Sequence, residues 1–150
     1  MKVEDVMTRD VRCCFACDPT TRAAQIMWDW DIGIVPVLAG DEVVGVVTDR
    51  DIAMAAYTQG KPLGQINVAA LMSAKLWSCS PSDLIETVER QMAEHRVRRL
   101  PVLDASRLVG IISLNDIARA SARAPRKVAP TLLTRTLGAI CEPRGDSPEA

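Results

Sequence analysis

Two kinds of hydrophobic spacing alternate along the chain. Apolar side chains recur every three or four positions over residues 19–31 and again from Ile85 to Met92, which is typical of a helix with one buried face. Each of these segments is followed by two short apolar runs, separated by a turn-like AGDE or DASR, and such runs predict strands. The four runs are residues 32–38, 43–47, 97–103 and 108–112. The residues expected to face the core from the first helix are Ala23, Ile26, Met27 and Trp30.

A helix start follows the second run of each pair. Thr48 and Ser113 are hydroxyl residues with an acid three positions on, an arrangement that caps a helix N-terminus. The first of these helices is expected to end near Gly60. Short extended stretches at residues 11–14 and 76–79 open the two halves. The order strand, helix, strand, strand, helix, given twice, predicts an α/β or α+β fold with helices on small mixed sheets.

The two halves repeat each other at an offset of 65 positions. Residues 6–53 align with residues 71–118 without a gap, and 12 of the 48 positions are identical. The identities include Met7 with Met72, Cys14 with Cys79, Pro36-Val37-Leu38 with Pro101-Val102-Leu103, Val44-Gly45 with Val109-Gly110, and Asp51-Ile52-Ala53 with Asp116-Ile117-Ala118. Two copies are too few for a solenoid, so we expect two pseudo-symmetric halves that bury each other's apolar faces.

These features divide the chain into four parts. We assign residues 1–60 to repeat 1, residues 61–70 to a linker, residues 71–122 to repeat 2, and residues 123–150 to a tail. The tail is expected to contain one short amphipathic helix, with an apolar face formed by Leu133, Leu137 and Ile140.

Composition excludes several classes of protein. Of the 150 residues, 48% are apolar and 25% are charged, with a net charge of −1, so we expect a compact domain that does not bind nucleic acid. No apolar stretch approaches the ~20 residues of a membrane span, and the N-terminus does not resemble a signal peptide, which favours a cytoplasmic protein. The single histidine, His95, and the lack of phosphate-loop or metal motifs argue against an enzyme.

The segments IGIVPVLAGDEVVGVVTDRDI and VRRLPVLDASRLVGIISLNDI each combine a Pro-Val strand, a turn, a Gly-containing strand and a Thr/Ser-x-x-Asp helix start. In this they resemble the CBS domain family, named after cystathionine β-synthase, and the resemblance covers roughly residues 1–120. It implies a stand-alone tandem pair of CBS repeats, packed as a pseudo-dimer with two clefts. It also implies assembly into a homodimer and binding of adenosine-containing ligands in the clefts.

The same motif residues suggest how such a ligand would be held. A carboxylate suits the two hydroxyls of a ribose, so Asp51 and Asp116 are the expected ribose contacts. Thr48 and Ser113 lie at helix N-termini, where a phosphate is favoured. Adenine would pack against aliphatic strand residues, and charged or polar neighbours would add contacts. These further candidates are Val35, Pro36, Leu100, Pro101, Arg50, Arg98 and Asn115.

A purely structural explanation of the motif stays open, because Thr48 and Ser113 can simply cap their helices with Asp51 and Asp116 in the first turn. The second repeat also has Leu114-Asn115 where the first has Asp49-Arg50, which argues against equal occupancy of two sites.

The cysteines and a tryptophan suggest other roles. Burial of reduced thiols is expected by default, and a zinc or redox site is a lesser alternative whose ligands would be Cys13, Cys14, Cys17 and Cys79. Trp28 lies on the opposite side of its helix from the expected core face, so it is a candidate homodimer contact.

The sequence therefore predicts a regulatory module that binds AMP, ADP, ATP or S-adenosylmethionine and signals to an effector protein, with no required cofactor. The alternatives are a dimerisation module that binds no ligand and a cysteine-based zinc or redox sensor.

Overall fold

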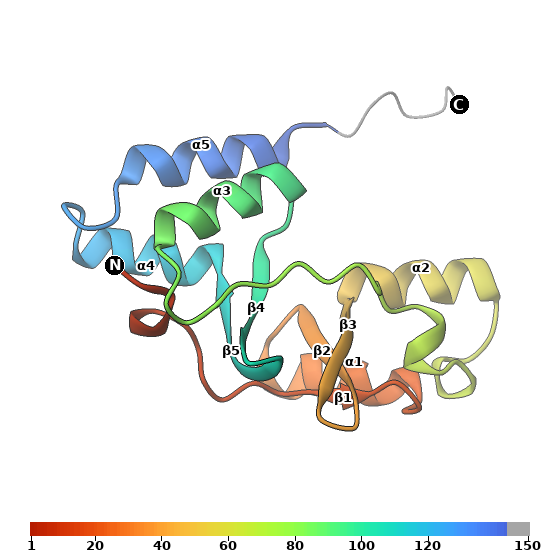
Figure 1. Cartoon of the computed structure of the whole chain (residues 1–150). Coiled ribbons are helices and arrows are strands. Elements are labelled where there is room, and N and C mark those ends of the chain that lie inside the picture. The colour runs from red at the N-terminus through yellow and green to blue at the C-terminus, as the bar shows by residue number, and fades with distance from the viewer. Residues whose placement is uncertain (144–150) are drawn as a thin grey trace. The chain divides into compact units, whose positions relative to one another are not determined.

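The computed structural model describes residues 1–143 of the chain. Its helices and strands form two compact units, each of which is described by itself (Figure 1). The repeat-1 unit consists of residues 10–76 together with 105–108. Within the described residues, the repeat-2 unit consists of residues 1–9, 77–104 and 109–143.

The repeat-1 unit is a three-stranded sheet with two α-helices. Its strands are β1 (Cys14–Phe15), β2 (Ile34–Ala39) and β3 (Glu42–Thr48), in the order β1-β2-β3, with β1 parallel and β3 antiparallel to β2. Its helices are α1 (Thr20–Trp30), α2 (Asp49–Gln59) and two 3₁₀ turns, η2 (Leu63–Gln65) and η3 (Val68–Ala70). The core contains Cys14, Ala23, Ile26, Val35, Val37, Val47, Ile52 and Val68.

The repeat-2 unit follows the same plan with fewer strands. It contains η1 (Val3–Asp5), α3 (Ile85–His95), β4 (Arg99–Asp104), most of β5 (Arg107–Ser113), α4 (Leu114–Arg123) and α5 (Pro130–Cys141). Strands β4 and β5 are neighbours in a two-stranded sheet. The extended stretch predicted at residues 76–79 is reduced to one parallel bridge between Cys79 and Val102. The predicted mixed α/β fold is therefore confirmed. The prediction of a strand at the start of the second repeat is wrong, because residues 76–79 form a single bridge.

Helix ends lie where the spacing predicted them. Helix α2 stops before Gly60, whose positive φ of 58° suits a residue without a side chain. Helices α1 and α3 end at Asp31 and Arg96, which occupy the same position of the two repeats and have positive φ of 50° and 52°. The same backbone conformation at these two helix ends supports the alignment of the repeats at a position where their residues differ.

The start of each repeat packs in the unit built by the other repeat. We call residues 1–9 and 66–74 the leading segments. The Val3 amide donates to the Asp83 carbonyl at 2.9 Å, and the Val68 amide donates to the Asp18 carbonyl at the same distance. Further along, Thr8 pairs with Ile111 and Ser73 pairs with Val46, both antiparallel. The second leading segment, which includes residues 66–70 of the predicted linker, therefore contributes to a core as well as connecting the repeats.

A flat side chain stacks at the end of the first helix of each unit. In the repeat-1 unit the Arg12 guanidinium lies 3.6 Å from the Trp30 ring centroid. In the repeat-2 unit the rings of Trp77 and His95, at the same two positions, stack with centroids 3.5 Å apart. The prediction that Trp30 faces the core is wrong, because it is the last residue of α1 and is 52% exposed, covered in part by Arg12.

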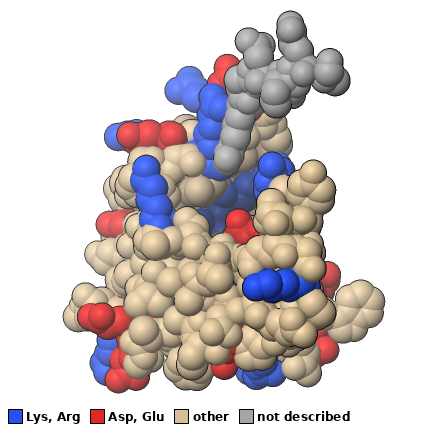
Figure 2. Space-filling view, turned by 90° about the vertical axis from the view of Figure 1, so that its right-hand side faces the viewer, with Lys and Arg blue, Asp and Glu red and all other residues tan. Residues whose placement is uncertain are grey.

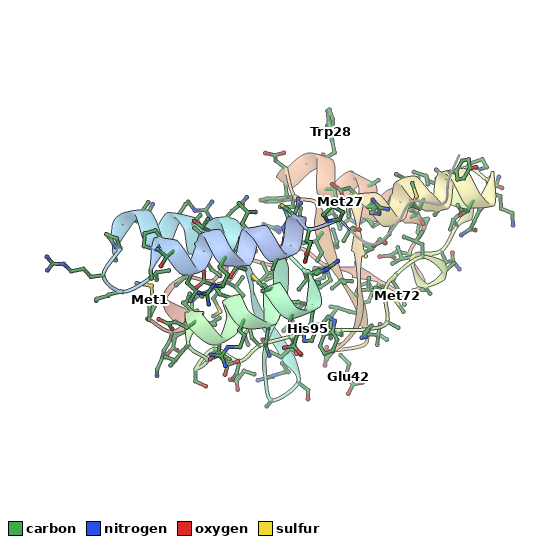
Figure 3. The ribbon with its side chains drawn as sticks, turned by 90° about the horizontal axis from the view of Figure 1, so that it is seen from above. Met1, Met27, Trp28, Glu42, Met72 and His95 are labelled. Atoms are coloured by element: carbon green, nitrogen blue, oxygen red, sulfur yellow. The ribbon has the colours of Figure 1, made fainter. Side chains whose placement is uncertain are left out.

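Trp28 projects from α1 away from the ribbon (Figure 3) and is 88% exposed, as its helical position predicted. Within residues 1–143, no helix has the length and apolar character needed to cross a membrane.

The predicted tail helix is present as α5, but its buried face differs from the predicted one. Leu133 and Ile140 pack against the core of the repeat-2 unit, as expected. Leu137 is exposed, and Thr136 is buried in its place. Thr136 is buried because this side of α5 lies against α3, where the Thr136 hydroxyl donates to the backbone carbonyl of Glu89 at 3.5 Å.

Candidate functional site

The predicted hydroxyl and acid residues form the same capping box in both repeats. In the repeat-1 unit the Thr48 amide and hydroxyl donate to Asp51 Oδ2 at 2.8 and 2.7 Å, and the Asp51 amide donates to Thr48 Oγ1 at 3.2 Å. Ser113 and Asp116 make the equivalent bonds at 2.9, 2.5 and 3.1 Å. The capping role left open by the sequence is therefore present at both helix starts.

The two acids differ in what contacts their second oxygen. Arg119 forms an ion pair with Asp116 Oδ1, and Asp116 is buried. Residue 54 stands at the position of Arg119 in the first repeat, and it is a methionine. Within the repeat-1 unit, no hydrogen bond or ion pair reaches Oδ1 of Asp51. One carboxylate oxygen of Asp51 is therefore outside the capping box and has no partner in its unit, whereas the corresponding oxygen of Asp116 is paired with a cation. Aligning the two repeats in the sequence would have revealed this difference, because Met54 and Arg119 occupy the same position.

The helix starts also differ in charge. At α2 the carboxylate of Asp49 accepts the Arg50 amide at 2.8 Å, so an acid already occupies part of the position where a phosphate would bind. At α4 the residue in register with Asp49 is Leu114, whose amide donates to the Arg98 carbonyl at 2.9 Å. The start of α4, with exposed Asn115 beside it, is the less acidic of the two.

The remaining predicted contacts lie on β2, on β4, in the segment before β4 and in the first turn of α2. Val35 and Leu100 are completely or almost completely buried, and each belongs to the core of its own unit. Pro36 and Pro101 follow them, are buried as well, and by strand alternation lie on the other face of their strands. Adenine contact by Val35 and Leu100 would therefore require the cores to open. The side chains of Arg50 and Arg98 are exposed.

Four of the cysteines were candidates for zinc or redox chemistry. Cys14 and Cys79 are buried in the two cores, Cys13 is half-buried and Cys17 is exposed. Burial raises the pKa of Cys14 to about 11, with Asp18 adding to the effect, and burial with Asp83 raises that of Cys79 to about 12. Since the thiolate is the metal ligand and the nucleophile, these environments oppose both chemistries. Among residues 1–143, no three His, Cys, Asp or Glu side chains gather closely enough to hold a metal ion.

Most of the surface visible in Figure 2 is uncharged. Several Lys and Arg side chains lie close together in the upper part of this face, and the other charged side chains are scattered.

Known proteins share both the repeats and the fold. The sequence matches the CBS domain family over residues 3–57 and 68–123. The CBS domain-containing protein YhcV of Bacillus subtilis is 38% identical over 116 residues, which cover 77% of this chain and 82% of YhcV.

Two crystal structures extend the comparison. The structure of Hypoxic Response Protein I with two coordinated zinc ions has a TM-score of 0.73 and 33% identity, and covers 79% of this chain and 98% of that one. The curated Hypoxic response protein 1 comes from Mycobacterium tuberculosis. The CBS domain pair of protein MJ0100, in complex with 5′-methylthioadenosine and S-adenosyl-L-methionine, has a TM-score of 0.75. It covers 82% of this chain and 97% of that one, and at 22% identity it shows the fold alone. With one match in each repeat, the chain belongs to the CBS domain family.

Proposed function

We propose that this protein is a regulatory module that binds an adenine nucleotide or a related adenosyl ligand, and that binding changes how it engages an effector protein. The observation that carries this proposal is that the capping box uses only Oδ2 of Asp51, so Oδ1 can accept hydrogen bonds from a ligand. A ribose presents two hydroxyl donors to such an oxygen. The adenosyl ligands in the MJ0100 CBS pair support the choice of ligand class.

We propose Asp51 as the main ribose contact and Asp116 as the weaker one, because Arg119 already occupies an oxygen of Asp116. Asp49 beside Arg50 places a second carboxylate at the start of α2, where it would repel a phosphate. The Asp51 site should therefore accept adenosyl ligands without a phosphate, such as S-adenosylmethionine, at least as well as AMP. Thr48, Ser113, Pro36 and Pro101 remain proposed neighbours of the ligand.

Thermal unfolding with AMP, ATP and S-adenosylmethionine tests the proposal. A ligand at about 100 times its Kd should add about 2.7 kcal/mol to the free energy of unfolding. The Asp51→Asn variant should weaken binding by about 10- to 100-fold, since a hydrogen bond to a charged group is lost. Failure of all three ligands to raise Tm would contradict ligand sensing and favour a structural dimerisation module.

Asp116→Asn and Arg119→Met form the matched controls for that experiment. Asp116→Asn should change affinity much less than Asp51→Asn does. Arg119→Met gives repeat 2 the residue that stands at this position in repeat 1, so titration calorimetry should show stronger binding at a second site. Equal losses from Asp51→Asn and Asp116→Asn would contradict the assignment of unequal sites.

We further propose that the chain forms a homodimer through α1 and α2. Large apolar side chains on these helices are exposed to solvent, whereas the corresponding helices of repeat 2, α3 and α4, pack against α5. The exposed side chains are Trp28 at 88%, Tyr57 at 84%, Trp30 at 52% and Met54 at 47%.

Sedimentation velocity should show a dimer for the native protein and a shift toward monomer for Trp28→Ser. A tryptophan near the centre of an interface typically contributes about 2 kcal/mol or more. Leu84→Ser, which removes an exposed apolar side chain from outside α1 and α2, is the matched control and should leave the dimer intact. A monomeric native protein, or equal effects of the two substitutions, would contradict this interface.

A further inference from the structure

Helix α5 gives the repeat-2 unit a cover that the repeat-1 unit lacks among residues 1–143. It lies along α3 (Figure 1) and also packs on α4. Leu133 and Ile140 attach it to the core, and the ion pair between Arg96 and Glu142, at 3.2 Å, joins the C-terminal ends of α3 and α5. Helices α1 and α2, which occupy the same positions in repeat 1, instead leave Trp28 and Tyr57 exposed.

An acid is buried where α5 covers α3. Glu89 is 0% exposed, and neither of its carboxylate oxygens has a hydrogen-bond partner within residues 1–143. The Thr136 hydroxyl of α5 approaches the backbone carbonyl of Glu89, not its carboxylate. The repeat register places Ala24 at this position of repeat 1, so the core itself does not require an acid. A buried, unpaired carboxylate is costly when ionised and tolerated when protonated.

The charges around Glu89 do not offset this cost. Burial, together with a smaller effect of the Glu86 carboxylate one turn earlier on α3, raises the pKa of Glu89 to about 7. The ionisable residues of α5, Arg135 and Cys141, are exposed. On α4, Asp116 is paired with Arg119, and Arg123 is exposed. The other ionisable residues of α3 are Arg90, Glu94 and His95.

We propose that α5 is a proton-controlled cover of the face formed by α3 and α4. It is held in place while the Glu89 carboxyl is protonated, and it is loosened when that carboxyl ionises. Lifting α5 returns Glu89 to water, where the ionised form is solvated. The cover therefore exchanges one proton with solvent as it opens and closes.

The direction of the pH dependence follows from linkage. In the covered state the pKa of Glu89 is about 7, against the ordinary value of 4.5 once α5 has lifted. The covered state binds the proton more tightly, so docking of α5 is strongest below the ordinary pKa and weakens as the pH rises to about 7. Between pH 5 and pH 8, the equilibrium constant for docking should fall on the order of 50-fold.

Amide hydrogen exchange over residues 130–141, corrected for the intrinsic rate at each pH, measures this equilibrium directly. In the native protein, protection of α5 should fall on the order of 50-fold from pH 5 to pH 8, while protection of α2 stays constant. In the Glu89→Gln variant, which keeps the shape of the protonated side chain, α5 should stay protected at pH 8.

Two further variants complete the test. Glu89→Ala, which installs the residue found in repeat 1, should also remove the pH dependence, so it serves if Glu89→Gln does not fold. Glu86→Gln should keep the pH dependence and move its midpoint to lower pH, because the carboxylate that raises the pKa of Glu89 is gone. Constant protection of native α5 across this range would overturn the proposal. So would an unchanged pH dependence in Glu89→Gln or Glu89→Ala.

Discussion

Gly45→Ala is expected to reduce the free energy of unfolding by about 3 kcal/mol, the upper range for overpacking a core. A Cβ atom on Gly45 would lie 2.6 Å from the Ser73 carbonyl oxygen and 3.1 Å from the Met72 sulfur. The Ser73 oxygen cannot withdraw cheaply, because it accepts the Val46 amide at 3.2 Å and the Ser73 amide donates back to Val46 at 2.9 Å. The substitution should therefore separate the second leading segment from β3. Urea denaturation gives the total loss.

Gly110→Ala is the matched control, at the same position of the other repeat. Its Cβ would meet the Met7 sulfur at 2.6 Å and the Thr8 carbonyl oxygen at 3.1 Å. The end of a methionine side chain can rotate away, so we expect a loss of about 1 kcal/mol. Losses of equal size from the two substitutions would show that backbone crowding at Gly45 is not the cause.

Removing residues 2–8 is expected to destabilise the repeat-2 unit, although these residues belong to the start of repeat 1 in the chain. The deletion removes Val3 and Met7 from the repeat-2 core, the bond from the Val3 amide to Asp83, and the pairing of Thr8 with Ile111. Burial of two apolar side chains contributes about 1.5–3 kcal/mol each, so the loss should be about 4 kcal/mol. Val3→Asp should reproduce much of it, because an unpaired charge would be placed in that core.

Hydrogen exchange distinguishes the two units in this experiment. After the deletion, protection should fall in α3 and β5, while α1 and β2 keep most of theirs. A loss confined to α1 and β2 would contradict the packing of the first leading segment described above.

The local features of this fold could be predicted from the sequence because they depend on neighbours in the chain. Thr48 and Asp51 are three positions apart, which is sufficient to define a capping box. Gly60 marks the end of a helix by itself. The internal repeat then transferred each local prediction from one half to the other.

Features that depend on distant segments were not predictable in this way. Hydrophobic spacing placed Trp30 in the core, but Arg12 covers it at the surface. Hydrophobic spacing also placed Leu137 on the buried face of α5. The burial of Thr136 instead depends on its contact with Glu89, which is 47 positions away in the chain. At the candidate site, the spacing identified both acids. The inequality between them depends on Met54 and Arg119 and becomes visible only when the two repeats are compared residue by residue.

The crossed packing of the leading segments constrains how such a gene can be rearranged. Recombination that replaced one contiguous repeat would bring a foreign leading segment into the half that was retained, and deprive the incoming half of its own. Val3 and Val68 fill the corresponding positions of the two cores, so a viable chimaera must match both at once. An exchange of both repeats together should therefore be tolerated better than an exchange of one.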